Sequence, residues 1–289
     1  MSALGTVIKQ NNENWDVLMK EYVAKHKPYI CILTPCYGGT CYISYLHSLI
    51  MTIESLRKYD IHFAIDFCKN DSLVSRARNN LIAKAMARKE TTHILFIDSD
   101  ITWSPIDIYK LLLDDKFLIG GIYPLKKYYW DRLTVNGKNN TFIKDCLEKR
   151  DKNGFQNTLS DEEVIQNNLL RYNVNYTGNV LHIENNLAKV KHVATGFMMI
   201  KRATIEKMCA QFPDTKYEDD VGFLNAEENK YAYALFDCGV EEGHYFSEDW
   251  MFCHRWTNMG GNVYLDVTIN LTHTGVEEYK GSYITSIMN

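Results

Sequence analysis

The sequence contains no long uninterrupted run of apolar residues. Its longest runs, such as Ile94–Ile97 and Phe117–Ile122, are far shorter than the roughly 20 residues needed to cross a bilayer. The segment Met1–Gln10 carries neither a basic leader nor the apolar stretch of a secretory signal. We therefore expect no membrane span and a location in the cytoplasm, a reducing compartment.

An excess of one charge sign is also missing. The chain has 32 Lys and Arg residues against 36 Asp and Glu residues, a formal net charge of −4 at pH 7. Without a basic surplus, nucleic acid is a poor candidate partner. With 46% hydrophobic and 24% charged residues, the composition is that of a globular protein rather than a disordered or collagen-like chain.

Closely spaced cysteine pairs are absent, although the chain has 8 cysteines. None lies in a Cys-x-x-Cys arrangement, which argues against a zinc ribbon and against a thioredoxin-like motif. We expect most of them to be small buried hydrophobic side chains. Internal repeats and Gly/Ser linkers are also lacking, so we predict a single domain over residues 1–289.

Strand-like and helix-like segments do alternate along the first 125 residues. The alternation predicts an α/β fold with a doubly wound, mostly parallel central sheet flanked by helices. Strands are expected at 29–33, 62–67, 93–97 and 117–122, with helices at 45–56, from Asp71 or Ser72 to Arg88, and from Pro105 after the N-cap Ser104.

The second half of the sequence is less regular. Residues 126–191 are polar and Asn-rich, which predicts loops and short antiparallel strands. Beyond this region we expect a strand at 193–200, helices at 203–211 and from the N-cap Ser247 to Gly260, and a last strand at 262–266.

Three loops should meet at the carboxyl edge of the parallel sheet, where α/β proteins bind their ligands: 34–39, 70–78 and 98–100. In the last of these, Asp98 and Asp100 can both point out of the sheet edge. Two such carboxylates favour Mg²⁺ or Mn²⁺. The alternative is a solvated acidic turn that caps the next helix.

Arg76 and Arg78 lie near the start of the second predicted helix. Cations there oppose the helix dipole, which suggests that an anionic ligand binds them together with the free backbone N–H groups. Alternatively, they pair with Asp66, Asp71 or a neighbouring Glu.

Several short motifs resemble those of the GT-A-fold nucleotide-sugar glycosyltransferases, especially the enzymes of giant algal viruses. The motifs that carry this resemblance are Ser72–Asn79 (SLVSRARN), Phe96–Asp100 (FIDSD), Gly120–Pro124 (GGIYP), Ser247–Trp250 (SEDW) and His273–Gly275 (HTG). The resemblance implies a nucleotide-binding half at 29–125. The acceptor side and a metal-binding tail would follow at 126–289, and a viral enzyme of this kind would act in the host cytoplasm.

The resemblance also implies a role for each matching residue on the donor side. Asp100 and His273 would bind Mn²⁺, or Mg²⁺, and Asp98 would contact the ribose or the metal's water shell. Ser99 is the variable middle residue. The base and phosphates of the nucleotide would contact Thr34, Tyr37, Asp71, Arg76, Arg78 and, at the diphosphate, Lys280. For His273, an ordinary half-buried histidine is the alternative interpretation.

On the acceptor side, the resemblance assigns Asp249 as the catalytic base and Glu248 as a ligand of sugar hydroxyls. Trp250 would stack on a sugar, and Gly196 would let the backbone approach the donor or acceptor. Each has a structural alternative: acidic residues after Ser247 stabilise the helix dipole, Trp250 can belong to the core, and Gly196 can form a strand bulge.

This resemblance implies a metal-dependent glycosyltransferase that moves a sugar from a UDP- or GDP-linked donor, with UDP favoured, to a hydroxyl of a glycan or glycoprotein, with inversion. A retaining transferase of the GDP-mannose type remains open. A sugar nucleotidyltransferase would need a Gly-rich phosphate loop after the first strand, which Cys36–Gly39 matches only faintly. An inactive glycan-binding module is the third alternative.

Overall fold

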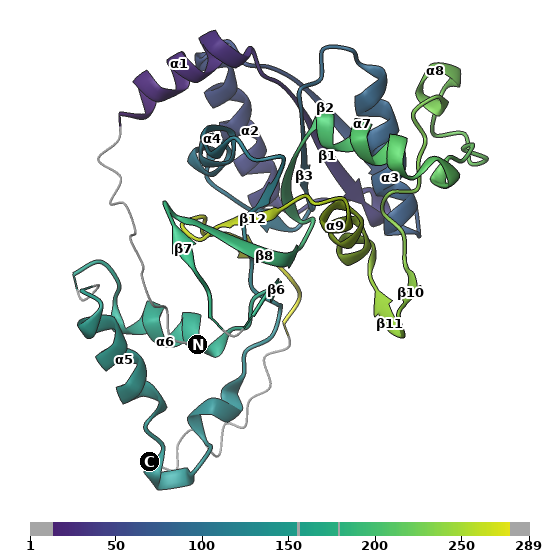
Figure 1. The fold of residues 1–289 in the computed structure, drawn as a ribbon. Coiled ribbons are helices and arrows are strands. Elements are labelled where there is room, and N and C mark those ends of the chain that lie inside the picture. Colours follow the sequence, from purple (N-terminus) through teal and green to yellow (C-terminus); the bar gives the residue numbers. More distant parts are fainter. Residues whose placement is uncertain (1–13, 155–156, 179, 278–289) are drawn as a thin grey trace.

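The computed structural model describes residues 14–154, 157–178 and 180–277. A nine-stranded sheet lies at its centre (Figure 1). Its strands follow the order β2 (His62–Lys69), β1 (Tyr29–Cys36), β3 (His93–Ile97), β9 (Phe197–Lys201), β5 (Leu118–Gly120), β12 (Val263–Asp266), β8 (Leu187–Val193) and β6 (Val174–Tyr176), and β7 (Ile183–Glu184) pairs with β8.

Parallel pairing joins β1 to both β2 and β3, and β5 to β12. Strands β9 and β8 run against their neighbours, so the other strands of this sheet share one direction. The α/β class and the mostly parallel sheet are therefore confirmed. The single strand expected at 193–200 is wrong in one respect: β8 ends at Val193, the chain turns at Thr195–Gly196, and β9 begins at Phe197.

Helices cover both faces of this sheet (Figure 1). One face packs on α1 (Trp15–His26), α2 (Ile43–Lys58) and α4 (Pro105–Asp114), and the other on α3 (Val74–Ala87), α7 (Arg202–Gln211) and α9 (Glu248–Asn258). Strand β1 serves both cores, because Ile30 and Ile32 point to the first layer whereas Cys31 and Leu33 point to the second. Burial on both faces explains its unbroken apolar sequence.

The predicted first residue is confirmed for helix α4 and wrong for helix α3. Ser104 and Asp107 form the reciprocal capping box of α4, and Pro105 is its first residue, as predicted. Helix α3 begins at Val74 rather than after Asp71 or Ser72. The reason is local: the Asp71 carboxylate accepts the backbone N–H of Leu73 at 3.0 Å, which holds the chain in a turn before the helix.

The expectation of loops and short strands at 126–191 missed two helices, α5 (Phe142–Lys152) and α6 (Asp161–Leu169). Both are mainly polar, and each buries only one or two side chains, which explains their weak periodicity. The Ser160–Glu163 capping box at the start of α6 was the available signal. Figure 1 shows both helices projecting away from the central sheet.

The remaining elements are short. They are the antiparallel pairs β10 (Gly239–Glu241) with β11 (His244–Phe246) and β4 (Ile101–Thr102) with β13 (Thr272–His273), helix α8 (Ala226–Asn229), and the 3-10 turns η1 (Tyr37–Gly39), η2 (Trp130–Leu133), η3 (Gly137–Asn139) and η4 (Pro213–Thr215). No helix in the described ranges is long and apolar enough to span a membrane. All eight cysteines are free thiols and five of them are buried, as expected for most.

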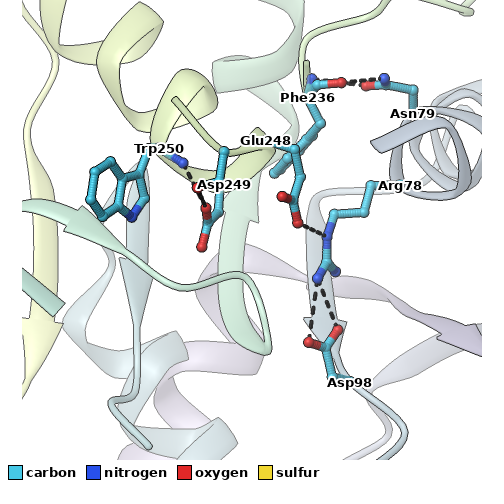
Figure 2. Close-up of polar contacts among 8 residues, drawn as sticks. Arg78, Asn79, Asp98, Phe236, Glu248, Asp249 and Trp250 are labelled. Atoms are coloured by element: carbon cyan, nitrogen blue, oxygen red, sulfur yellow. Dashed lines mark hydrogen bonds and ion pairs between the residues drawn. The ribbon is translucent and has the colours of Figure 1, made fainter. Parts of the chain in front are cut away.

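A buried two-way hydrogen bond fastens α3 to the segment before α9 (Figure 2). The Asn79 amide donates to the Phe236 carbonyl at 2.6 Å and accepts the Phe236 N–H at 2.9 Å. Asn79→Ala leaves both backbone groups unpaired, so we expect the free energy of unfolding to fall by about 2–4 kcal/mol. Chemical denaturation measures this loss. The exposed Asn258→Ala is the control, and an equally small effect of both changes would contradict the assignment.

Candidate functional site

The three loops predicted to meet do line one pocket at the carboxyl edge of β1, β2 and β3. Its cavity volume is about 220 Å³. The lining residues are Pro35, Cys36, Tyr37, Cys68, Asp71, Val74, Ala77, Asp98, Ser99 and Asp100. Five of the candidate residues therefore share this pocket: Tyr37, Asp71, Asp98, Ser99 and Asp100.

Tyr37 and Thr34, both assigned to nucleotide binding, differ in their exposure. Tyr37 is 77% exposed at the rim of the pocket, where its ring is free to contact a ligand. Thr34 is fully buried, and its hydroxyl lies 2.6 Å from the Tyr45 hydroxyl. Thr34 therefore supports the pocket wall from behind rather than facing the cavity.

Arg76 forms the pair that was considered as the alternative to anion binding. Its guanidinium donates two hydrogen bonds to Asp71, at 2.7 and 2.9 Å. These bonds lower the pKa of Asp71, although its burial acts in the opposite direction. The pair leaves Arg76 partly exposed at the mouth of the pocket.

Arg78 is buried and bridges the two acidic motifs (Figure 2). Its Nη2 lies 3.1 Å from Asp98 Oδ1, and its Nε lies 3.3 Å from Glu248 Oε1. Its Nη1 has no hydrogen-bond partner within the described part of the chain. One buried cation thus holds the Asp-Ser-Asp turn against the start of α9, and one of its donors remains available.

Asp100 and His273 come together although they lie far apart in the sequence. Strand β13 pairs with β4, and the Thr274 N–H donates to the Asp100 carbonyl at 2.9 Å. This pairing brings His273 Nε2 to 3.3 Å from Asp100 Oδ2, the same oxygen that Lys126 Nζ approaches to 2.5 Å. Burial raises the pKa of Asp100, but its contacts with His273 and Lys126 outweigh burial and leave the pKa lowered.

The orientation of His273 fits a metal ligand. Its Nδ1 lies 2.8 Å from the Pro124 carbonyl, which only accepts, so Nδ1 carries the proton. Nε2 therefore faces Asp100 Oδ2 at 3.3 Å, and a cation placed between them could be bound by both. A histidine whose far nitrogen donates to a carbonyl is the usual arrangement in metal sites.

The donor set also fits a hard divalent ion, with the protein supplying few ligands. Within the described ranges, no three His, Cys, Asp or Glu side chains cluster around one point. Asp98 faces the buried Arg78, whereas Asp100 faces His273 and the partly exposed Lys126, so Asp100 and His273 are the two candidate ligands. Mg²⁺ and Mn²⁺ sites commonly keep several waters and substrate phosphates, so two protein ligands are compatible with such an ion.

Glu248 and Asp249 form the first turn of α9, and both side chains lie beside the Arg78 bridge (Figure 2). Asp249 accepts hydrogen bonds from the Ser247 hydroxyl and from the Trp250 N–H, the latter at 2.8 Å. Burial is the largest influence and raises the pKa of Asp249, and the nearby Glu248 charge adds to it. A carboxylate with a raised pKa is a better proton acceptor than an ordinary aspartate.

Trp250 is half-buried and stacks on His192, with ring centroids 5.0 Å apart and planes inclined by 7°. Gly196 lies in the turn between β8 and β9, not in a strand bulge. A Cβ there would come within 2.6 Å of the Tyr123 hydroxyl, so contact with Tyr123 alone is enough to require glycine. The Gly196 carbonyl accepts the Asp98 N–H at 3.0 Å, which joins this turn to the acidic motif.

His192 makes stability depend on pH. Burial lowers its pKa from 6.5 to about 4, so the folded protein keeps it neutral while the unfolded chain protonates it. We expect the folded state to lose up to about 3 kcal/mol as the pH falls from 6.5 towards 4. Denaturation at pH 7 and pH 4.5 measures this loss, which His192→Gln should reduce. His93, whose pKa is also lowered to about 4, stays in both proteins, so an identical pH dependence would refute the role of His192.

Sequence reasoning missed three residues of this region: Lys126, Tyr123 and His192. Tyr123 lay inside the Gly120–Pro124 motif, and Lys126 follows two residues after it, so that motif was the available signal. Nothing local marks His192, because its contacts come from α9 and β6. Lys280, predicted to contact the diphosphate, lies outside the described residues.

Comparison with protein families and with curated proteins finds no match. Among solved structures, this chain is similar to A197 from STIV, with 16% sequence identity, a TM-score of 0.43 and 86% of each chain covered. That degree of likeness assigns neither a family nor an activity.

Proposed function

We propose that this protein is a metal-dependent glycosyltransferase that moves a sugar from a nucleotide donor to a hydroxyl of a glycan, with a UDP-sugar as the favoured donor. The observation that carries the proposal is the approach of His273 to Asp100, which lines the strand-end pocket. An α/β protein binds its ligands at such a pocket, and these two side chains are suited to Mn²⁺.

In the proposed reaction, the pocket holds the nucleotide between Tyr37 and the Asp98–Asp100 turn. Asp100 and His273 would hold a divalent ion there, which would supply positive charge to offset that of the departing diphosphate. Arg78, buried between Asp98 and Glu248, fixes both carboxylates in place.

Asp249 accepts the proton of the acceptor hydroxyl in this scheme. As the O–H bond breaks, the acceptor oxygen bonds to the anomeric carbon, and the bond from that carbon to the diphosphate oxygen breaks. Attack from the face opposite the diphosphate inverts the configuration. The raised pKa of Asp249 supports the assignment, because the base must hold the proton once transfer is complete.

The test is to incubate the protein with a panel of UDP- and GDP-sugars and Mn²⁺ and to measure the free nucleoside diphosphate released. Slow hydrolysis of one donor, faster with a glycan acceptor, is the expected result. Turnover that depends on pyrophosphate would indicate a nucleotidyltransferase instead. Glycan binding without turnover of any donor would indicate a binding module.

A further inference from the structure

Lys126 is the closest partner of the candidate metal ligand Asp100. Its Nζ lies 2.5 Å from Asp100 Oδ2, and its side chain is 38% exposed. The stem of Lys126 passes over Gly275, where a Cβ would come within 2.6 Å of its Cδ. Its own segment holds the other ligand, because the Pro124 carbonyl pairs with His273 Nδ1 at 2.8 Å. The segment that carries Lys126 therefore contacts both Asp100 and His273.

The ammonium of Lys126 and a divalent ion cannot use Asp100 Oδ2 together. Ligand oxygens lie about 2.1 Å from ions such as Mg²⁺, so an ion on this oxygen would overlap the space of the ammonium. The two cations would also repel each other strongly at such a distance. An ion shared by Asp100 and His273 would lie at Oδ2, the oxygen that also faces His273 Nε2 at 3.3 Å, so its binding there requires Lys126 to leave Oδ2.

The released ammonium would remain beside the pocket. Its stem has four flexible carbons, and Asp100 itself lines the pocket wall. The two arginines of the site are already paired, Arg76 with Asp71 and Arg78 with Asp98 and Glu248. Of Arg76, Arg78 and Lys126, Lys126 is thus the one whose ion pair would be broken when the divalent ion binds. Its ammonium would then be able to contact an anionic ligand.

We propose that Lys126 has two positions: it neutralises Asp100 when no divalent ion is bound, and it contacts the diphosphate of the bound nucleotide once the ion takes Asp100. This inference rests on the proposed function. The same lysine then weakens binding of the ion alone and strengthens binding of the nucleotide in the presence of the ion.

The experiment compares Lys126→Gln with the wild type and with Lys127→Gln, a matched control whose ammonium lies over the Tyr129 ring. Free Mn²⁺ is followed by electron paramagnetic resonance, first with protein alone. Lys126→Gln should bind Mn²⁺ about 3- to 10-fold more tightly than the wild type. Isothermal titration with UDP at saturating Mn²⁺ should then show about 5- to 20-fold weaker binding of UDP. Lys127→Gln should match the wild type in both.

Each result decides between the two claims. If Lys126→Gln leaves Mn²⁺ affinity unchanged while Asp100→Asn abolishes it, the inference fails and the metal site stands. Unchanged UDP affinity in Lys126→Gln overturns the contact with the diphosphate. If the wild type binds no Mn²⁺ even with UDP present, the proposed function fails together with the inference. Lys126→Arg, which keeps the charge, should bind Mn²⁺ as the wild type does.

Discussion

Asp100→Asn is expected to lower the rate of nucleotide release from the donor sugar by roughly 1,000-fold or more. Metal stabilisation of a leaving group amounts to several kcal/mol, and each 1.36 kcal/mol corresponds to a factor of ten in rate. An asparagine at this position keeps the shape of the side chain but lacks the charge that holds the ion. The lowered pKa of Asp100 means that the wild-type carboxylate is ionised at neutral pH.

The measurement is the initial rate of nucleoside diphosphate release with saturating Mn²⁺ and donor. Asp16→Asn, on the surface of α1, is the control and should retain the wild-type rate. Thermal denaturation of both variants establishes that they are folded. A rate for Asp100→Asn within threefold of the wild type would remove the ion from the mechanism.

Asp249→Asn should reduce sugar transfer by about 100- to 10,000-fold, the usual contribution of a general base. Donor affinity should stay within threefold of the wild type, because the proposed function assigns Asp249 to the acceptor and because Asp249 is not among the residues that line the strand-end pocket. Transfer rates with acceptor and titration of the nucleoside diphosphate measure the two quantities separately. Equal loss of transfer and of donor binding would overturn the assignment of Asp249 as base.

The raised pKa of Asp249 also predicts the direction of two pH effects. The wild-type transfer rate should fall on acidification through that raised pKa, since the protonated carboxyl accepts no proton. Ionisation of the buried carboxylate costs stability as the pH rises from the unfolded to the folded pKa. Asp249→Asn removes that cost, so this variant should be at least as stable as the wild type at neutral pH.

Local patterns predicted the strand-end pocket well. Strand β3 was predicted to the residue, and the loops after β1, β2 and β3 meet because parallel strands end at one edge. The helix starting at Pro105 was equally readable, since Ser104 and Asp107 carry their capping information in neighbouring residues.

Long-range pairings left no comparable trace in the sequence. The insertion of β9 between β3 and β5 depends on pairings across the whole chain, so its direction could not be deduced from 193–200 alone. His273 reaches Asp100 only because β13 pairs with β4, and only the family resemblance suggested it. Lys126 packs against Gly275, just beyond the same pairing, so its ion pair with Asp100 could not be predicted from the sequence.

We propose that Asp100 and His273 bind a divalent ion through which a nucleoside diphosphate is held. Calorimetric titration of UDP and of GDP, with Mn²⁺ and with a chelator, tests it most directly. We expect at least tenfold tighter binding of one of these nucleotides with Mn²⁺, and loss of that gain in His273→Ala. Equal affinity for both nucleotides with and without the ion would contradict it.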